Sequence, residues 1–174
     1  MKILQGFIGL ILFTCIIPVK GFSQIEEAKK ISWDIDSTTS FKAPRDNVWD
    51  LLKDLSKWNE ISDGYIARVD VKKVGYNMKM TLVFADSSRR TDMVTQYQPE
   101  YRFIVIEVKE PLPAGVTENT FTVVVNALTE NSCTVKFGIR AEGDEVGRTQ
   151  LLKELKREMV AILSGLNKKL SAAN

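Results

Sequence analysis

Residues 43–58 read APRDNVWDLLKDLSKW, and this stretch decides the fold more than any other part of the chain. Pro44 suits the first turn of a helix, where its missing N–H is not needed, and Asp46 lies near the positive end of that helix. Ser56 can cap a second short turn, which holds Trp58. The apolar residues between them recur with helical spacing at Val48, Trp49, Leu51, Leu52 and Leu55. The stretch therefore predicts a pair of short helices.

Strand patterns surround this helix pair. Before it, Ile31, Trp33 and Ile35 alternate with polar residues, which predicts one half-buried strand that places Asp34 and Asp36 on its solvent face. After it, the apolar period changes to two. Segments with this alternation follow at residues 67–71, 78–84, 89–97, 104–108, 121–127 and 133–139. Because short turns join most of them, we expect the strands to be antiparallel.

One long amphipathic helix closes the chain. It is expected to begin between Asp144 and Thr149, and from Glu145 to Leu170 it would span about 39 Å. Its apolar stripe recurs every three or four residues, at Leu152, Leu155, Met159, Ile162, Leu166 and Leu170. The order of strand, helix pair, strands and long helix predicts an α+β fold. In such a fold a curved antiparallel sheet wraps around the last helix and can leave a pocket beside it.

The first residues have the layout of a secretory signal peptide. A basic start at Lys2 precedes an apolar run from Phe7 to Ile17, and small residues precede Gln24. We expect cleavage after residue 23, which makes residues 24–30 a flexible lead-in and the product secreted or periplasmic. The alternative is a retained anchor, but the apolar run is shorter than the ~20 residues that a spanning helix needs.

Charge and residue types exclude several classes of function. Of the 24 basic residues, Lys2 and Lys20 lie in the leader, so processing leaves 22 basic against 22 acidic residues. A neutral mature chain has no general attraction for nucleic acid or anionic membrane, so we expect neither nucleic-acid binding nor stable membrane insertion. The oligomeric state stays open.

The chain contains no histidine, which excludes the usual zinc sites, histidine-ligated haem and serine–histidine–aspartate triads. We therefore expect neither a metal nor a cofactor. After processing, Cys133 is the only cysteine, so no intramolecular disulfide can form. Its position in an apolar strand predicts a small buried hydrophobe rather than a nucleophile.

The helix-pair motifs and the closing helix together resemble the START-like superfamily, also called Bet v 1-like or SRPBCC. The residues that carry the resemblance are Phe41-x-Ala43-Pro44-x-x-x-Val48-Trp49-x-Leu51-Leu52 and Leu55-Ser56-x-Trp58. The chain is most similar to the polyketide cyclase/dehydrase and lipid-transport branch. The resemblance implies a helix-grip fold, with about seven antiparallel strands around the C-terminal helix, in a ligand-binding domain at residues 31–174. Members bind lipids, sterols, hormones or polyketides. Many of them have Trp-Pro where this chain has Trp58-Asn59.

In such a fold the inward-facing side chains would bind the ligand. If Met93 points inward, Arg89 and Tyr97 share its face and could donate hydrogen bonds to a carbonyl or carboxylate. Arg90 is interpreted as a surface residue at a hairpin end. The predicted ligand-binding residues are Met78, Met80, Phe84, Arg89, Met93, Tyr97, Phe121, Val123, Phe137, Ile139, Leu155 and Met159. The alternative is that the apolar members only fill a solid core.

The sequence supports a carrier more than an enzyme. No pair of acidic residues has the pattern of a general acid and base, and no catalytic residue is predicted. The leading hypothesis is an exported, non-enzymatic carrier or sensor of a hydrophobic or amphipathic small molecule. One alternative is an enzyme of the cyclase/dehydrase type that uses Tyr97 and Arg89. Another is a cell-envelope interaction module with a vestigial cavity.

Overall fold

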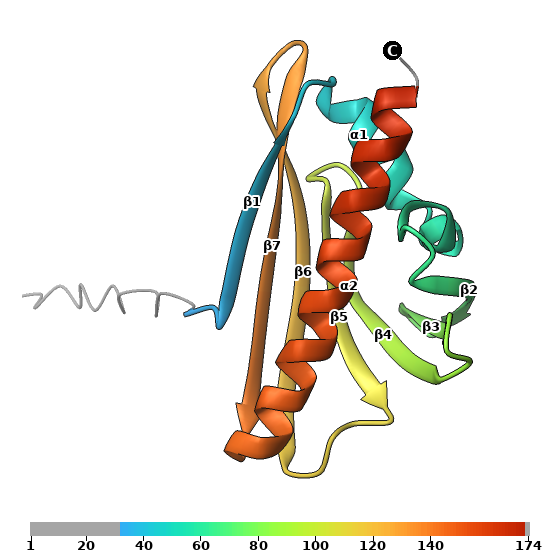
Figure 1. Cartoon of the computed structure of the whole chain (residues 1–174), viewed down its shortest axis with the longest axis vertical. Coiled ribbons are helices and arrows are strands. Elements are labelled where there is room, and N and C mark those ends of the chain that lie inside the picture. Colours follow the sequence, from blue (N-terminus) through green and yellow to red (C-terminus); the bar gives the residue numbers. More distant parts are fainter. Residues whose placement is uncertain (1–31, 173–174) are drawn as a thin grey trace, which may run out of the picture. The chain divides into compact units, whose positions relative to one another are not determined.

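The computed structural model describes residues 32–172 (Figure 1). The predicted leader at 1–23 and lead-in at 24–30 lie outside these residues and stay predictions. The elements in chain order are β1 (Ile35–Phe41), α1 (Arg45–Lys53), the 3-10 helix η1 (Leu55–Ile61), β2 (Ile66–Val74), β3 (Asn77–Phe84), β4 (Arg89–Gln98), β5 (Phe103–Glu110), β6 (Val116–Thr129), β7 (Ser132–Gly143) and α2 (Glu145–Ala172).

The strands form one antiparallel sheet in the order β1-β7-β6-β5-β4-β3-β2. Helix α2 runs along the concave face of this sheet, and α1 with η1 closes one end between the sheet edges (Figure 1). The predicted α+β helix-grip architecture is therefore confirmed. Within residues 32–172, no helix has the length and apolar character needed to cross a membrane.

The helix pair forms where the sequence predicts it. Pro44 stands just before α1, and its carbonyl oxygen accepts the N–H groups of Asn47 and Val48. Trp58 is fully buried in η1, and its indole N–H donates to the carbonyl of Leu52 at 2.8 Å. This bond fixes η1 against α1. The indole therefore anchors the helix pair by packing and by one hydrogen bond.

The core lies between α2 and the sheet. Cross-strand partners such as Val123 and Phe137 share the inner face, because residues directly opposite in an antiparallel pair point the same way. Gly165 lets α2 approach η1 closely, since a Cβ there would lie 2.1 Å from the carbonyl oxygen of Ile61. Cys133 is buried among the apolar residues, as the sequence predicts.

The first strand differs from its prediction. The strand begins at Ile35, although the predicted alternation of exposed and half-buried residues extends back through Asp34 to Trp33. The Asp34 carboxylate accepts the N–H of Ala141 at 2.9 Å and pairs with Arg148, and only 18% of its side chain is exposed. Asp34 lies on the solvent-facing side as predicted, but the prediction missed that its carboxylate joins the end of β7 to α2.

Candidate functional site

A buried cluster of three charged side chains links β4 to α2. The guanidinium of Arg90 donates to Asp92 through Nε at 2.8 Å and through Nη2 at 2.7 Å. The same Nη2 donates to the Glu158 carboxylate of α2 at 2.5 Å. All three residues are at most 4% exposed. We call Arg90, Asp92 and Glu158 the charged cluster.

The charged cluster contains one cation and two carboxyl groups, so full ionisation would leave a buried net negative charge. Burial raises the pKa of Glu158 and outweighs the attraction of Arg90, and the neighbouring Asp92 raises it further. Burial also raises the pKa of Asp92 against the attraction of Arg90. For Arg90, burial opposes the charge, but the two carboxylates outweigh it and raise the pKa of the guanidinium. The cluster therefore tends to keep a proton on one of its carboxyl groups.

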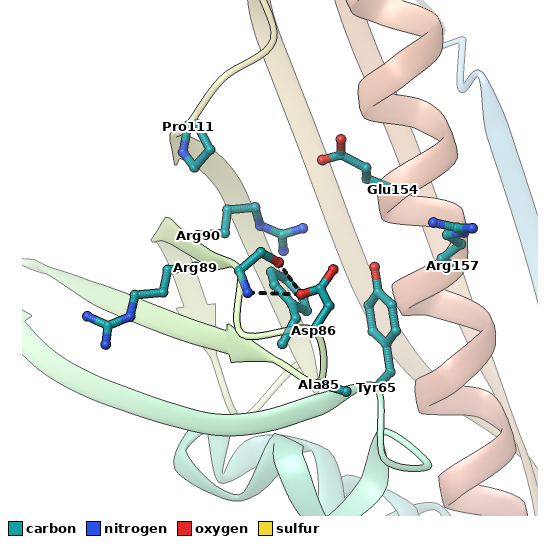
Figure 2. A pocket seen from close by; sticks show the side chains of 10 residues that line it. Tyr65, Ala85, Asp86, Arg89, Arg90, Pro111, Glu154 and Arg157 are labelled. Atoms are coloured by element: carbon teal, nitrogen blue, oxygen red, sulfur yellow. Dashed lines mark hydrogen bonds between the residues drawn. The ribbon is translucent and has the colours of Figure 1, made fainter.

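The guanidinium of Arg90 also forms part of the wall of a cavity of about 390 Å³. Phe84 lies beneath it, with the guanidinium carbon 5.3 Å from the ring centroid, and the Tyr65 ring lies 5.2 Å from Phe84. Figure 2 shows Tyr65 beside α2, with its hydroxyl directed between Arg90 and Arg157. The residues that line this inner cavity are Tyr65, Phe84, Ala85, Asp86, Ser88, Arg89, Arg90, Pro111, Glu154 and Arg157.

The polar groups of the inner cavity differ in whether they already have hydrogen-bond partners within the protein. Asp86 accepts hydrogen bonds from the backbone N–H and the hydroxyl of Ser88 at 2.9 and 2.5 Å. Burial, followed by the negative charge of Glu158, raises the pKa of Tyr65, so its phenol stays protonated and able to donate. An aromatic wall next to a phenol and guanidinium groups suits a ligand with both an apolar and a polar part.

The predicted ligand-binding residues are divided among different regions. Phe84 and Arg89 line the inner cavity, although Arg89 is directed away from α2 in Figure 2. Met78 and Tyr97 line a separate hollow, of about 330 Å³, near the other end of β3. The Tyr97 hydroxyl donates to the carbonyl of Lys53 at 3.2 Å, and its ring stacks on Trp49. Tyr97 thus binds α1 to the sheet.

The remaining apolar candidates lie in the hydrophobic core, and none of them lines the inner cavity. They are Met80, Phe121, Val123, Phe137, Ile139, Leu155 and Met159, each at most 4% exposed. On β4 the inward set is Arg90, Asp92 and Val94, whereas Met93 pairs with Lys79 and Glu107 on the outer face. The expectation that Met93 points inward is therefore reversed. The interpretation of Arg90 as a hairpin-end surface residue is wrong.

Eight of the ten lining residues were missed by reasoning from the sequence: Tyr65, Ala85, Asp86, Ser88, Arg90, Pro111, Glu154 and Arg157. One signal was available for the charged cluster. Arg90 and Asp92 are two residues apart and so share a strand face, and Glu158 falls within the apolar stripe of the closing helix. An acid in such a stripe indicates a buried partner of opposite charge. Across residues 32–172, no group of three His, Cys, Asp or Glu side chains could hold a metal ion.

Comparison with known families identifies the chain. The family model described as polyketide cyclase / dehydrase and lipid transport matches residues 32–171. The chain belongs to this family. The resemblance to the START-like, or Bet v 1-like, superfamily is thereby confirmed. A search of curated protein sequences gave no match.

Solved structures share the fold at low sequence identity. The protein XoxI from Bacillus cereus is 15% identical, with a TM-score of 0.67 over 78% of this chain and 94% of that one. Norcoclaurine synthase from Thalictrum flavum, in complex with dopamine and hydroxybenzaldehyde, is 15% identical, with a TM-score of 0.64 over 80% of this chain and 87% of that one. The Zhui aromatase/cyclase from Streptomyces sp. R1128 is 21% identical, with a TM-score of 0.58 over 79% and 92%. These similarities establish the fold alone.

Proposed function

We propose that this protein is a non-enzymatic carrier or sensor that binds an amphipathic small molecule in the inner cavity. The observation that carries the proposal is a hollow of about 390 Å³ whose wall combines the Tyr65 and Phe84 rings with the Arg90 guanidinium. That volume lies within the range of small-molecule sites. The site differs from the apolar interior that the sequence predicts, since it lies beside α2 and the β3–β4 turn.

The cavity wall is rigid on the side of the charged cluster. Arg90 is held by three charge-assisted hydrogen bonds, so its position does not depend on a ligand. A preformed wall reduces the entropy lost on binding. Because the guanidinium of Arg90 is already paired with two carboxyl groups, we expect it to take part in ligand binding rather than in catalysis.

The test is to identify what the purified chain carries and whether the cavity holds it. Small molecules extracted from the native protein would be analysed by mass spectrometry, alongside the Ala85→Trp variant, which places a bulky side chain at the cavity wall. Ala127→Trp is the matched control, because Ala127 is exposed on β6 and does not line the cavity. We expect a compound with the parent and the control and none with Ala85→Trp. Equal recovery from the parent and both variants, or an empty parent, would exclude the proposal and favour a vestigial cavity.

A second candidate is an enzyme of the cyclase/dehydrase type, favoured by the juxtaposition of the Tyr65 phenol with the charged cluster. A phenol that stays protonated can donate to a substrate carbonyl, and the carboxyl groups behind Arg90 can hold the proton that such chemistry moves. Turnover of an aromatic or polyketide-like substrate that Tyr65→Phe abolishes, without loss of binding, would establish this candidate. Binding without turnover would leave the carrier.

We further propose that the chain is exported and that its leader is removed before Gln24. The support is the sequence pattern of residues 1–23, which combines a basic start, an apolar run and small residues before the cleavage position. N-terminal sequencing of the protein recovered from its native cell envelope or medium tests this. A mature N-terminus at Gln24 is expected, and an intact Met1 in the recovered protein would refute it.

A further inference from the structure

A second hollow, of about 730 Å³, lies on the surface of α2 and meets the inner cavity at Tyr65 and Arg157, which line both. We call it the α2 groove. It is lined by Asp63, Tyr65, Lys153, Lys156, Arg157, Val160, Ala161 and Ser164. Because the helical members are three or four residues apart, they form one continuous stripe along α2. The inner cavity and the α2 groove can therefore contact different parts of a single ligand.

The α2 groove has an apolar floor and a cationic rim. Val160 is 53% exposed on that stripe, next to Ala161 and the Tyr65 ring. Asp63 is already paired with Lys168 and accepts the Ser164 hydroxyl at 2.7 Å. The acidic member of the groove is thus satisfied by residues of the fold.

The cations of the rim lack such partners. Within residues 32–172, no carboxylate lies at salt-bridge distance from Lys153, Lys156 or Arg157, whereas Lys168 and Lys169 at the end of α2 are paired. Lys153 and Arg157 are four residues apart and so are neighbours on the helix surface. Three unpaired cations beside an apolar floor are complementary to an anionic group attached to an apolar body.

We infer that the ligand is an amphipathic acid, whose carboxylate, sulfonate or phosphate group is bound by Arg157 and Lys153 in the α2 groove while its apolar part enters the inner cavity between Tyr65 and Phe84. This inference rests on the proposed binding function and adds the chemical class of the ligand. Arg157 determines the class, since it is the cation that lines both hollows.

The experiment compares two fluorescent probes that differ by one acidic group: anilinonaphthalene sulfonate and its neutral parent, phenylnaphthylamine. We expect the sulfonate to bind more tightly, and we expect Arg157→Gln to raise its Kd about tenfold, the lower end for a hydrogen bond to a charged group. The same variant leaves the Kd of the neutral probe unchanged. Arg68→Gln, which changes an exposed arginine of β2, is the matched control and alters neither Kd. Thermal melting of each variant verifies that it is folded.

The outcomes separate this inference from the proposed function. If both probes bind, Ala85→Trp abolishes both and Arg157→Gln changes neither, the inner cavity is a binding site but the acidic class is refuted. If neither probe binds the parent, or Ala85→Trp has no effect on either, the proposed function fails and this inference fails with it. A Kd for the sulfonate that rises with salt more steeply in the parent than in Arg157→Gln supports the inference, because Lys153 remains in the variant.

Discussion

Replacing Arg90 by methionine tests whether the charged cluster holds α2 to the sheet. Methionine keeps much of the side-chain volume but removes the guanidinium, which makes three hydrogen bonds to two buried carboxylates. Each hydrogen bond to a charged group contributes about 1.5–3 kcal/mol, and the gain is partly offset by the cost of burying the guanidinium. Breaking a buried ion pair on one side typically costs about 3–5 kcal/mol. We therefore expect the free energy of unfolding to fall by about 3–5 kcal/mol, a large part of the stability of a typical domain.

The assay is urea unfolding of the parent, Arg90→Met and Arg89→Met, monitored by tryptophan fluorescence and circular dichroism. Arg89 precedes Arg90 on the same strand but is exposed and forms no salt bridge within residues 32–172, so its loss should cost less than about 0.5 kcal/mol. The loss in Arg90→Met should shrink as the pH falls. Protonation neutralises the two carboxyl groups that the variant leaves buried without a counter-charge. A loss in Arg90→Met within 1 kcal/mol of that in Arg89→Met would refute the reasoning, since 1 kcal/mol is the order of a single neutral hydrogen bond.

Three further substitutions test the packing around α2. Burial raises the pKa of Glu158, so the stability that its protonated form contributes is fully present below the ordinary pKa of 4.5 and is lost as the pH rises through the raised pKa. Glu158→Gln should therefore cost only about 1–2 kcal/mol and should flatten the decline of stability with rising pH. A decline as steep as that of the parent would contradict this prediction. Met159→Asp places an acid without a partner in the core and should lower stability by at least about 3 kcal/mol, so a melting temperature equal to that of the parent would mean that this helix face is wrongly assigned. Gly165→Ala puts a Cβ 2.1 Å from the Ile61 carbonyl oxygen and should cost about 1–3 kcal/mol by forcing α2 from η1, measured by denaturation, whereas a gain from the higher helix propensity of alanine would show that the contact yields easily.

The fold could be predicted because its signals are local and periodic. Alternation along 133–139 and spacing of three and four along the closing helix follow directly from strand and helix geometry. The short turns then make the strands antiparallel. The prediction for β1 was less accurate at Asp34, whose N–H donates to the Ile139 carbonyl in the manner of a strand while its carboxylate also accepts the N–H of Ala141. A single sequence gives no sign of that bond.

The site could be predicted only in part, because its residues are brought together by tertiary contacts. Tyr65, Phe84 and Arg157 are far apart in the chain and meet only when α2 packs on the sheet. On β4 the usual rule that polar residues face solvent selected Met93 as an inward residue. Arg90 and Asp92 break this rule because each provides the opposite charge that the other needs when buried. The acid on α2 completes the set, and its distance in sequence hides the relationship.

The ion pairs behind the inner cavity also limit how far the cavity can adapt. Moving α2 away from β4 to admit a bulkier ligand would separate Glu158 from Arg90 and leave it in an apolar environment, at a cost of several kcal/mol. Displacement of α2 is therefore too costly in free energy to enlarge the inner cavity readily. The protein should discriminate between guests by their dimensions at this wall, accepting slim molecules and rejecting broad ones of the same chemistry.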